Sequence, residues 1–241
     1  MRLTDFKALT FDCYGTLIDW ESGIADGLSR LASKASHQLS RDQVLEAHAR
    51  HESDQQQLTP KLPYNQLLAI VYKRLAEEWS SPYELDDAQA YGESVKNWPA
   101  FPDSASTLQY LAKYFKLVIV SNVDNESFRA SKAKLAVEFD AVVTAEDVGS
   151  YKPSARNFEC MFDALSSMGI QKGESLHVAD SIFHDLAPAG ELGIPSCWIH
   201  RRFEQRGFGA TMRSSIEPVV DYRFTSMAQL VKAHHEELAR N

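Results

Sequence analysis

Residues 11–17 read Phe11-Asp12-Cys13-Tyr14-Gly15-Thr16-Leu17, and the apolar run that begins at Ala8 ends there in a carboxylate. Open α/β sheets present reactive groups in this way, because a buried parallel strand delivers a side chain to its carboxyl end and the chain then turns. We therefore expect a buried strand over residues 7–12 that presents Asp12. Side chains alternate along a strand, so Cys13 is predicted to be a packing residue rather than a nucleophile.

The residue two positions after Asp12 bears on the chemistry of the site. A carboxylic acid at this position could protonate a leaving group, whereas this chain has Tyr14. A tyrosine has an unperturbed pKa of about 10 and is a much weaker acid near neutral pH. The sequence therefore favours a reaction whose leaving group departs without a proton.

From Pro99 onward, strand and helix patterns alternate along the chain. Short apolar runs predict strands at 117–121, 141–144, 176–179 and 197–199. Helical spacing predicts helices near 105–114, 126–134, 155–168, 186–192 and 227–238. Repeated βα units of this kind predict an α/β fold with a doubly wound, mostly parallel sheet.

Residues 20–98, in contrast, carry only helical patterns. Apolar residues recur at helical spacing from Ile24 to Ala35 and again from Leu68 to Trp79. Ser40 and Gln43 match a capping box, and another helix is expected at about 86–95. We predict a core domain formed by residues 1–19 and 99–241, and a helical cap domain formed by residues 20–98. The insertion leaves the core next to Asp12, so it is placed to close over that site as a lid.

Polar side chains follow the predicted strands of the core. Ser121-Asn122 ends one strand, Lys152-Pro153 follows the next, and Asp180 and Asp185 follow the third. The carboxyl ends of parallel strands open on one crevice, so these side chains are expected to meet Asp12. Each of them alone is also typical of a turn, a helix cap or a solvated loop.

Bulk composition excludes some classes of partner. The chain has 241 residues, a formal net charge of -8 and three cysteines without a CxxC pair. The acidic balance argues against nucleic acid and anionic membranes as partners. No leader pattern and no apolar stretch of membrane-spanning length is apparent, and the isolated cysteines are typical of reduced thiols. We therefore expect a cytoplasmic protein that acts on a small molecule.

The combined motifs resemble those of the haloacid dehalogenase (HAD) superfamily of hydrolases. The resemblance covers essentially the whole chain and rests on Asp12 through Thr16, on Ser121, on Lys152-Pro153, and on Asp180 with Asp185. It implies that Asp12 is a covalent nucleophile, that Ser121 donates a hydrogen bond to the bound group, and that Lys152 neutralises the carboxylates. The Tyr-Gly-Thr-Leu sequence that begins at Tyr14 and the Ser-Asn dipeptide at Ser121 look most like the corresponding motifs of the L-2-haloacid dehalogenases.

That resemblance implies hydrolysis of a small anionic 2-haloacid to a 2-hydroxy acid without a cofactor. Asp185 would orient or deprotonate the hydrolytic water. Further residues are expected to contact the substrate: Tyr14, Thr16, Asn122, Trp20, Phe183 and, from the cap, Arg50. Arg50 is equally compatible with a solvated helix charge.

Three departures from the dehalogenase pattern keep a second interpretation open. Asp180 retains an acid that these dehalogenases generally lack, whereas Ile182 and Phe158 stand where they have Asn and Tyr. The carboxylates of Asp12, Asp180 and Asp185 could together bind Mg²⁺, as in the phosphatases of the superfamily. The alternative is therefore a Mg²⁺-dependent phosphatase acting on a small phosphate ester. A third interpretation, a HAD-like binding module, is opposed by the complete set of site residues.

Several other features have ordinary structural interpretations. His48 and His51 could bind a metal but are expected to form a polar cap surface. Arg201 and Arg202 are expected in an exposed loop. Apolar stripes on the cap could pair two copies into a homodimer, although packing within the cap explains them equally well.

Overall fold

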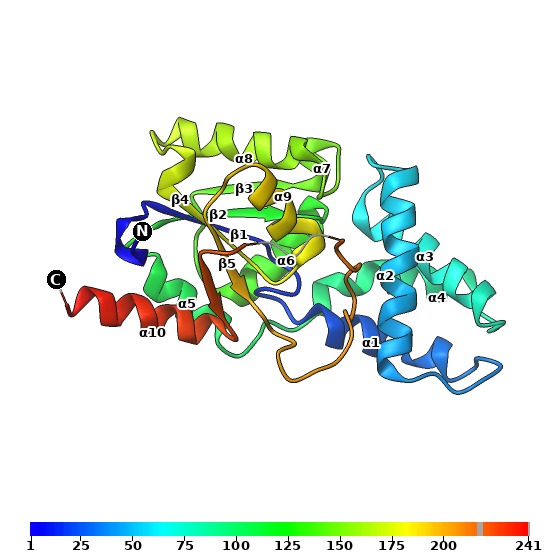
Figure 1. Ribbon diagram of the computed structural model, residues 1–241. Helices are drawn as coiled ribbons and strands as arrows, with labels where there is room; N and C mark the ends of the chain where they lie inside the picture. The colour runs from blue at the N-terminus through cyan, green and yellow to red at the C-terminus, as the bar shows by residue number, and fades with distance from the viewer. Residues whose placement is uncertain (216–218, 241) are drawn as a thin grey trace.

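A computed structural model describes residues 1–215 and 219–240 and contains one parallel sheet. Within these residues the strand order is β3-β2-β1-β4-β5-β6 (Figure 1). The strands are β1 (Ala8–Phe11), β2 (Lys116–Ser121), β3 (Ala141–Thr144), β4 (Ser175–Ala179), β5 (Ser196–Ile199) and β6 (Tyr222–Phe224). The predicted doubly wound α/β fold is confirmed, and β1 lies between β2 and β4.

Helices cover both faces of this sheet because apolar side chains alternate along its strands. Leu117 and Ile119 of β2 belong to the apolar cluster shared with α5 (Ser104–Leu111), α6 (Asn125–Leu135) and α10 (Met227–Leu238). Val118 and Val120 belong to the cluster shared with α8 (Ala155–Ser167) and α9 (Ala187–Glu191). Fully buried strands of this kind account for the continuous apolar runs in the sequence.

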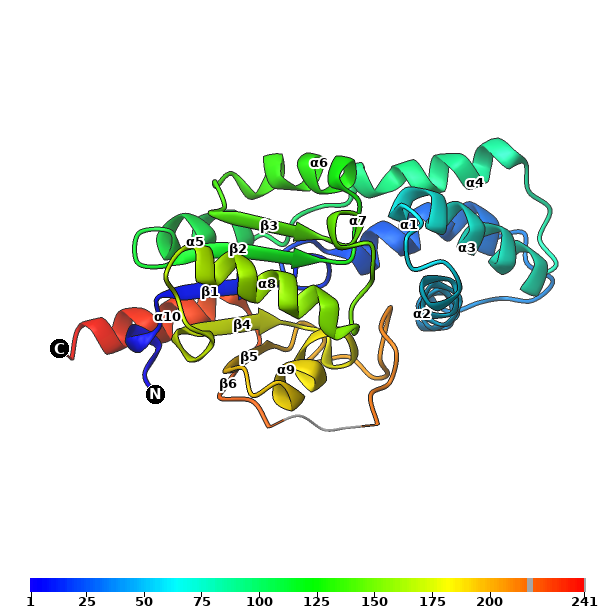
Figure 2. The ribbon, with the colours of Figure 1, turned by 90° about the horizontal axis from the view of Figure 1, so that it is seen from above.

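The inserted helices lie at the carboxyl end of the sheet, at the far side of the molecule from the two termini (Figures 1 and 2). They are α1 (Trp20–Ala32), α2 (Arg41–Leu58), α3 (Tyr64–Glu78) and α4 (Leu85–Gly92), followed by a 3₁₀ helix (Glu93–Asn97). We propose residues 20–98 as a cap domain and call this segment the cap below. The strand ends that carry the predicted site therefore face the cap.

The boundaries of the cap helices follow local chemistry. Ser40 accepts a hydrogen bond from the main chain of Gln43, and the Gln43 side chain accepts one from the main chain of Ser40, which completes the predicted capping box. The fourth helix ends at Gly92, earlier than expected, and continues as a 3₁₀ helix. A Cβ atom at Gly92 would lie 2.1 Å from the main-chain oxygen of Asn65, so close packing of α3 and α4 requires glycine there.

Other differences are local. Strand β6 was not expected, because three residues are too short to show a pattern. Short turns precede or follow the strands: 3₁₀ turns at Leu3–Asp5 and Lys172–Glu174, α7 (Ala145–Val148) and a π-helical turn (Ile182–Leu186). Cys13 is buried in the apolar core, as expected, and burial raises the pKa of its thiol. In the described part of the chain, no helix is long and apolar enough to cross a membrane.

Candidate active site

Asp12 lies directly after β1, where the main chain turns sharply. Gly15 has φ of +94°, a conformation that side chains rarely adopt, and a Cβ atom there would also lie 2.9 Å from Trp20 Nε1. The turn brings the Thr16 hydroxyl back to donate a 2.9 Å hydrogen bond to Asp12 Oδ2. The Gly-Thr sequence therefore orients the carboxylate as well as ending the strand.

Lys152 links the two carboxylates of the site. Its Nζ donates to Asp12 Oδ1 at 2.9 Å, to Asp185 Oδ1 at 2.7 Å and to the Val120 carbonyl at 2.8 Å. An ammonium has three donors, so these contacts use all of them. The Asn122 amide holds the main chain of Lys152 from both sides, because Oδ1 accepts from its N–H and Nδ2 donates to its carbonyl.

Charge and burial act against each other in this cluster. Burial alone would raise the pKa of Asp185, but the Lys152 ammonium and the hydrogen bond from His177 outweigh it and hold the value at about 2. Burial raises the pKa of Asp12, while Lys152 and Thr16 stabilise its ionised form. The two carboxylates outweigh burial at Lys152 and raise its pKa. Lys152 therefore stays charged, and Asp185 is the more strongly ionised of the two acids.

His177 extends this network into the sheet. Its Nε2 lies 3.0 Å from Asp185 Oδ1, and its Nδ1 lies 2.8 Å from the hydroxyl of Thr10 on β1. Sequence reasoning missed His177, although a histidine inside the apolar β4 strand was a usable signal. Because a buried polar group needs a partner, a carboxylate such as Asp185 was to be expected beside it.

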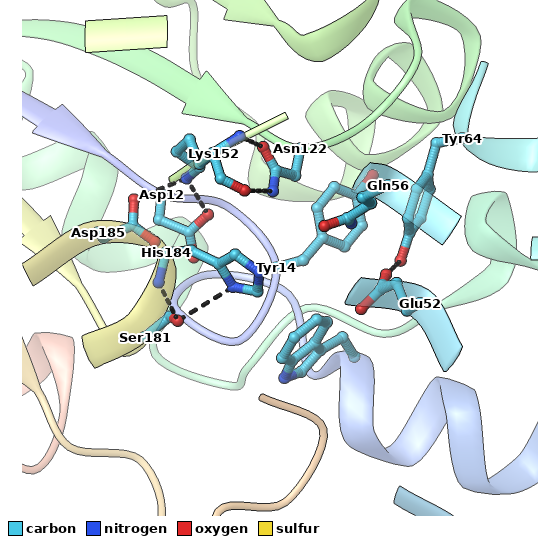
Figure 3. Close-up of a pocket in the computed structure, with 11 residues that line it drawn as sticks. Asp12, Tyr14, Glu52, Gln56, Tyr64, Asn122, Lys152, Ser181, His184 and Asp185 are labelled. Carbon is cyan, nitrogen blue, oxygen red and sulfur yellow. Dashed lines mark hydrogen bonds and ion pairs between the residues drawn. The ribbon is translucent and has the colours of Figure 1, made fainter. Parts of the chain in front are cut away.

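The site borders a narrow cavity between the core and the cap (Figure 3). Eleven residues line the cavity: Asp12, Tyr14, Trp20, Glu52, Gln56, Tyr64, Asn122, Lys152, Ser181, His184 and Asp185. Its volume of about 20 Å³ is room for about one water molecule. A substrate therefore enters only if the cap or the lining side chains move.

Tyr14 contributes an aromatic wall rather than an acid. Its hydroxyl lies 2.8 Å from Ser131 Oγ, and its ring packs edge-on against Trp98 with centroids 5.7 Å apart. Burial raises the pKa of Tyr14 well above its usual value. The phenol therefore stays protonated near neutral pH and is a poor proton donor to a leaving group.

The Asp180 carboxylate is held outside this cavity. Its Oδ1 accepts a 2.9 Å hydrogen bond from the main-chain N–H of Arg201, and it borders two neighbouring cavities instead. Burial raises the pKa of Asp180 to about 7. Lys152 lies between Asp12 and Asp185, and the Asp180 carboxylate is directed away from both. In this arrangement the described residues contain no group of three His, Cys, Asp or Glu placed to hold a metal, and the Mg²⁺ alternative stays a prediction.

The remaining predicted site residues lie at different places relative to the cavity. Ser121 Oγ is buried without a partner at the end of β2, beside Asn122 in the cavity wall. Thr16 lies behind Asp12 and does not line the cavity. Phe183 lies in an adjoining groove of about 420 Å³ between the cap and the loop at Lys152. Arg50 is not brought to the site, because both its terminal nitrogens bond Glu78 on the cap surface.

The cap contributes residues that the sequence did not single out. Glu52, Gln56 and Tyr64 line the cavity from α2 and α3, and Figure 3 shows them across it from Asp12. Helix α2 is polar along most of its length, so no apolar stripe indicated which side faces inward. His184, from the π-helical turn, also lines the cavity. Burial lowers its pKa to about 4, so it is neutral near pH 7.

Two expectations about basic groups were wrong. His48 is fully buried rather than on a polar surface, because it packs beside Tyr91 within the cap. Arg201 is largely buried and bonds the Thr16 carbonyl and Asp103. Arg202 is also buried and joins Glu21 and Asp42 of the cap. Arg201 therefore stabilises the core beside the Asp12 turn, and Arg202 connects the core to the cap, so neither lines an exposed loop.

Comparisons with known proteins agree with this architecture. Residues 6–193 match the haloacid dehalogenase-like hydrolase family. The chain is 28% identical over 210 residues to (S)-2-haloacid dehalogenase 4A of Burkholderia cepacia, covering 81% of this chain and 84% of that one. It is 26% identical over 233 residues to an (S)-2-haloacid dehalogenase of Xanthobacter autotrophicus, covering 92% and 86%.

Solved structures share the fold. The L-2-haloacid dehalogenase of Xanthobacter autotrophicus with covalently bound chloropropionic acid has a TM-score of 0.73 at 17% identity, covering 94% of this chain and 97% of that one. A Bacillus subtilis putative HAD-hydrolase bound to magnesium has the same TM-score at 16% identity, covering 98% and 100%. On the family match, this chain is an enzyme that belongs to the haloacid dehalogenase-like hydrolases.

Proposed function

We propose that this enzyme hydrolyses a small (S)-2-haloacid to a 2-hydroxy acid, with Asp12 as nucleophile. One observation carries the proposal most strongly. Asp12 is hydrogen-bonded to Lys152 beside a narrow cavity, where Tyr14 supplies an aromatic wall and the Asp180 carboxylate is directed elsewhere. The site therefore offers a buried nucleophile with a neutralising cation and a poor leaving-group acid, which suits the departure of a halide.

The first step is attack of an Asp12 oxygen on the carbon that bears the halogen. The C–O bond forms as the carbon–halogen bond breaks, and halide departs on the opposite side, leaving an aspartyl ester. Lys152 balances the negative charge of Asp12 and Asp185, all three of which are buried. Tyr14 and Trp20 give the halogen apolar surroundings.

The second step is attack of water on the carbonyl carbon of the ester. Asp185 Oδ2 and His184 Nε2 are both buried without a partner and are available to a water molecule. Because Asp185 has a pKa of about 2, it is a weak base and serves mainly to orient the water. Hydrolysis returns Asp12 and releases the 2-hydroxy acid.

The substrate carboxylate needs neutral donors in this site. Ser121 Oγ is buried without a partner, and Asn122 lies beside it in the wall. A cytoplasmic location and a homodimer stay predictions, as does the absence of a nucleic-acid partner.

Two product assays test this function. Halide release from L-2-chloropropionate and phosphate release from an aryl phosphate are measured with Mg²⁺ and with a chelator. We expect halide release that survives the chelator and is abolished in Asp12→Asn, because an amide is not a nucleophile at this position.

Phosphate release that requires Mg²⁺, without any halide release, would overturn the proposal in favour of the phosphatase alternative. A relative in Methanothermobacter thermautotrophicus, a glyceraldehyde 3-phosphate phosphatase, is 31% identical over 103 residues. That match covers only 42% of this chain and 44% of the relative, so it supports the alternative weakly.

A further inference from the structure

The cap side of the cavity presents a carboxyl group where an anionic substrate would meet it. Glu52 is 3% exposed and lines the cavity from α2 together with Gln56. Tyr64 of α3 donates a 2.6 Å hydrogen bond to its Oε1. This bond fixes the carboxyl group and leaves Oε2 for another partner.

The charges in the cavity wall are out of balance. Its lining contains three carboxyl groups, Asp12, Asp185 and Glu52, and one ammonium, Lys152. Lys152 already donates to both aspartates and to a carbonyl, so it has no donor left for a substrate. Within the described residues, Glu52 has no salt-bridge partner, in contrast to Asp12 and Asp185.

The groups around Glu52 are neutral near pH 7. Tyr64 on α3, Tyr91 on α4 and Tyr151 before Lys152 all have pKa values raised by burial and, secondarily, by Glu52. His48 stands one turn earlier on α2, and burial lowers its pKa to about 3. Burial likewise raises the pKa of Glu52 to about 7, although the Tyr64 hydrogen bond opposes it. Across the cavity lie Asp12, Lys152 and Asp185.

A bound substrate anion therefore affects which protonation state of Glu52 is favoured. An ionised Glu52 would share a narrow cavity lined by buried groups with a second negative charge, which low dielectric makes unfavourable. A protonated Glu52 instead offers an O–H donor to the same anion. Asp12 must stay ionised to attack, so Glu52 is the cavity carboxyl group that can take up the proton.

We propose that Glu52 is a specificity-determining residue that binds the substrate anion through its protonated carboxyl group, so that anion binding is coupled to proton uptake at the cap. The inference rests on the proposed function for its substrate class. It adds that the cap recognises the anion with a neutral acid rather than with a basic side chain. Substrate affinity then depends on pH through a residue outside the reacting set.

The pH dependence of KM for L-2-chloropropionate tests this role. Below the pKa of Glu52 the donor is present and KM is low. Above it KM rises, approaching about tenfold per pH unit, because each binding event must first protonate Glu52. In Glu52→Gln, the amide keeps an acceptor for Tyr64 and a donor for the substrate, so KM should stay flat from pH 6 to pH 9.

A matched control separates this role from a structural one. Glu46 is an exposed carboxylate on the same helix, and Glu46→Gln should retain the wild-type pH profile. If Glu52 only supported Tyr64, its replacement would shift KM equally at every pH. A flat wild-type KM, or a Glu52→Gln profile that still rises with pH, would overturn the inference.

Calorimetry with propionate tests the inference without turnover. At pH 8, titrations in buffers of different ionisation enthalpy should show uptake of about one proton per propionate bound by the wild-type protein and none by Glu52→Gln. Binding without proton uptake, or no binding at pH 6, would contradict the role of Glu52. Failure of halide release with every haloacid, in contrast, would count against the proposed function.

Discussion

Lys152 is the residue on which the arrangement of the site depends. It is 1% exposed and holds two carboxylates whose repulsion it offsets. A buried charge that loses its partner is strongly destabilising, because nothing replaces the lost solvation. The same contacts keep Asp12 oriented for attack. Stability and activity should therefore both respond to this one side chain.

Replacing Lys152 with methionine should lower both quantities. We expect Lys152→Met to reduce the free energy of unfolding by about 3–5 kcal/mol in urea titrations. The rate of halide release should fall by about 10²–10³-fold, a magnitude typical of losing one electrostatic stabiliser. Lys132→Met, at a surface pair with Glu138, is the control and should change stability by less than about 1 kcal/mol. Equal effects of the two substitutions would contradict the role of Lys152.

Residues of the site could be predicted from the sequence where they follow the end of a predicted strand. Asp12, Lys152 and Asp185 each follow a strand of the sheet, and the structure brings these three together. Glu52 and Tyr64 were not predictable, because their approach to the cavity depends on how α2 and α3 pack. Asp180 shares the strand-end signal, yet a main-chain N–H of Arg201 turns its carboxylate away.

At the scale of helices, the packing of α3 against α4 shapes the cap. The two helices approach so closely at Gly92 that a methyl group would collide with a carbonyl oxygen. Apolar periodicity predicted α1 and α3, whereas α2 was predicted from its capping box, because it lacks an apolar stripe. The sequence did not predict that the fourth helix ends at Gly92, nor that Gly92 packs against Asn65 on another helix, because that contact joins residues remote in sequence.

Gly92→Ala should therefore destabilise the protein. Because the Cβ atom would meet backbone rather than a flexible side chain, the helices must separate. We expect a loss of about 1–3 kcal/mol in unfolding free energy, measured by denaturant titration. Gly190→Ala in α9 is the matched control, since nothing lies within 4 Å of its Cβ position. The control should be neutral or stabilising by about 0.4–1 kcal/mol. A neutral Gly92→Ala would show that the close approach is not needed.

At the scale of the whole molecule, the core and the cap enclose the site together. Arg202 of the core bonds Glu21 on α1 and Asp42 on α2. The βα alternation was sufficient to predict the sheet, because each strand carries its own apolar signal. The distance between cap and core was not predictable. It follows from contacts between side chains remote in sequence, and it sets the small volume of the cavity.

Acid stability is a property of the whole molecule that His48 should influence. Burial lowers its pKa to about 3 in the folded protein, from 6.5 when exposed. The unfolded chain therefore binds more protons between these values, and stability is lost as the pH falls below about 6.5. The loss approaches about 1.4 kcal/mol per pH unit. In His48→Leu this loss of unfolding free energy below pH 6.5 should be absent. In His37→Leu, at an exposed position, the loss should remain. Parallel unfolding curves for both variants from pH 7 to pH 4 would contradict this assignment.

The central claim, that Asp12 forms an ester hydrolysed at its own carbonyl, is tested most directly by isotope labelling. The wild-type enzyme in excess is given L-2-chloropropionate in oxygen-18 water for a single turnover. Mass spectrometry then locates the label. The account predicts oxygen-18 in the peptide that contains Asp12 and none in the 2-hydroxypropionate released. Oxygen-18 in the first-turnover product, with Asp12 unlabelled, would mean that water attacks the substrate directly and would contradict the account.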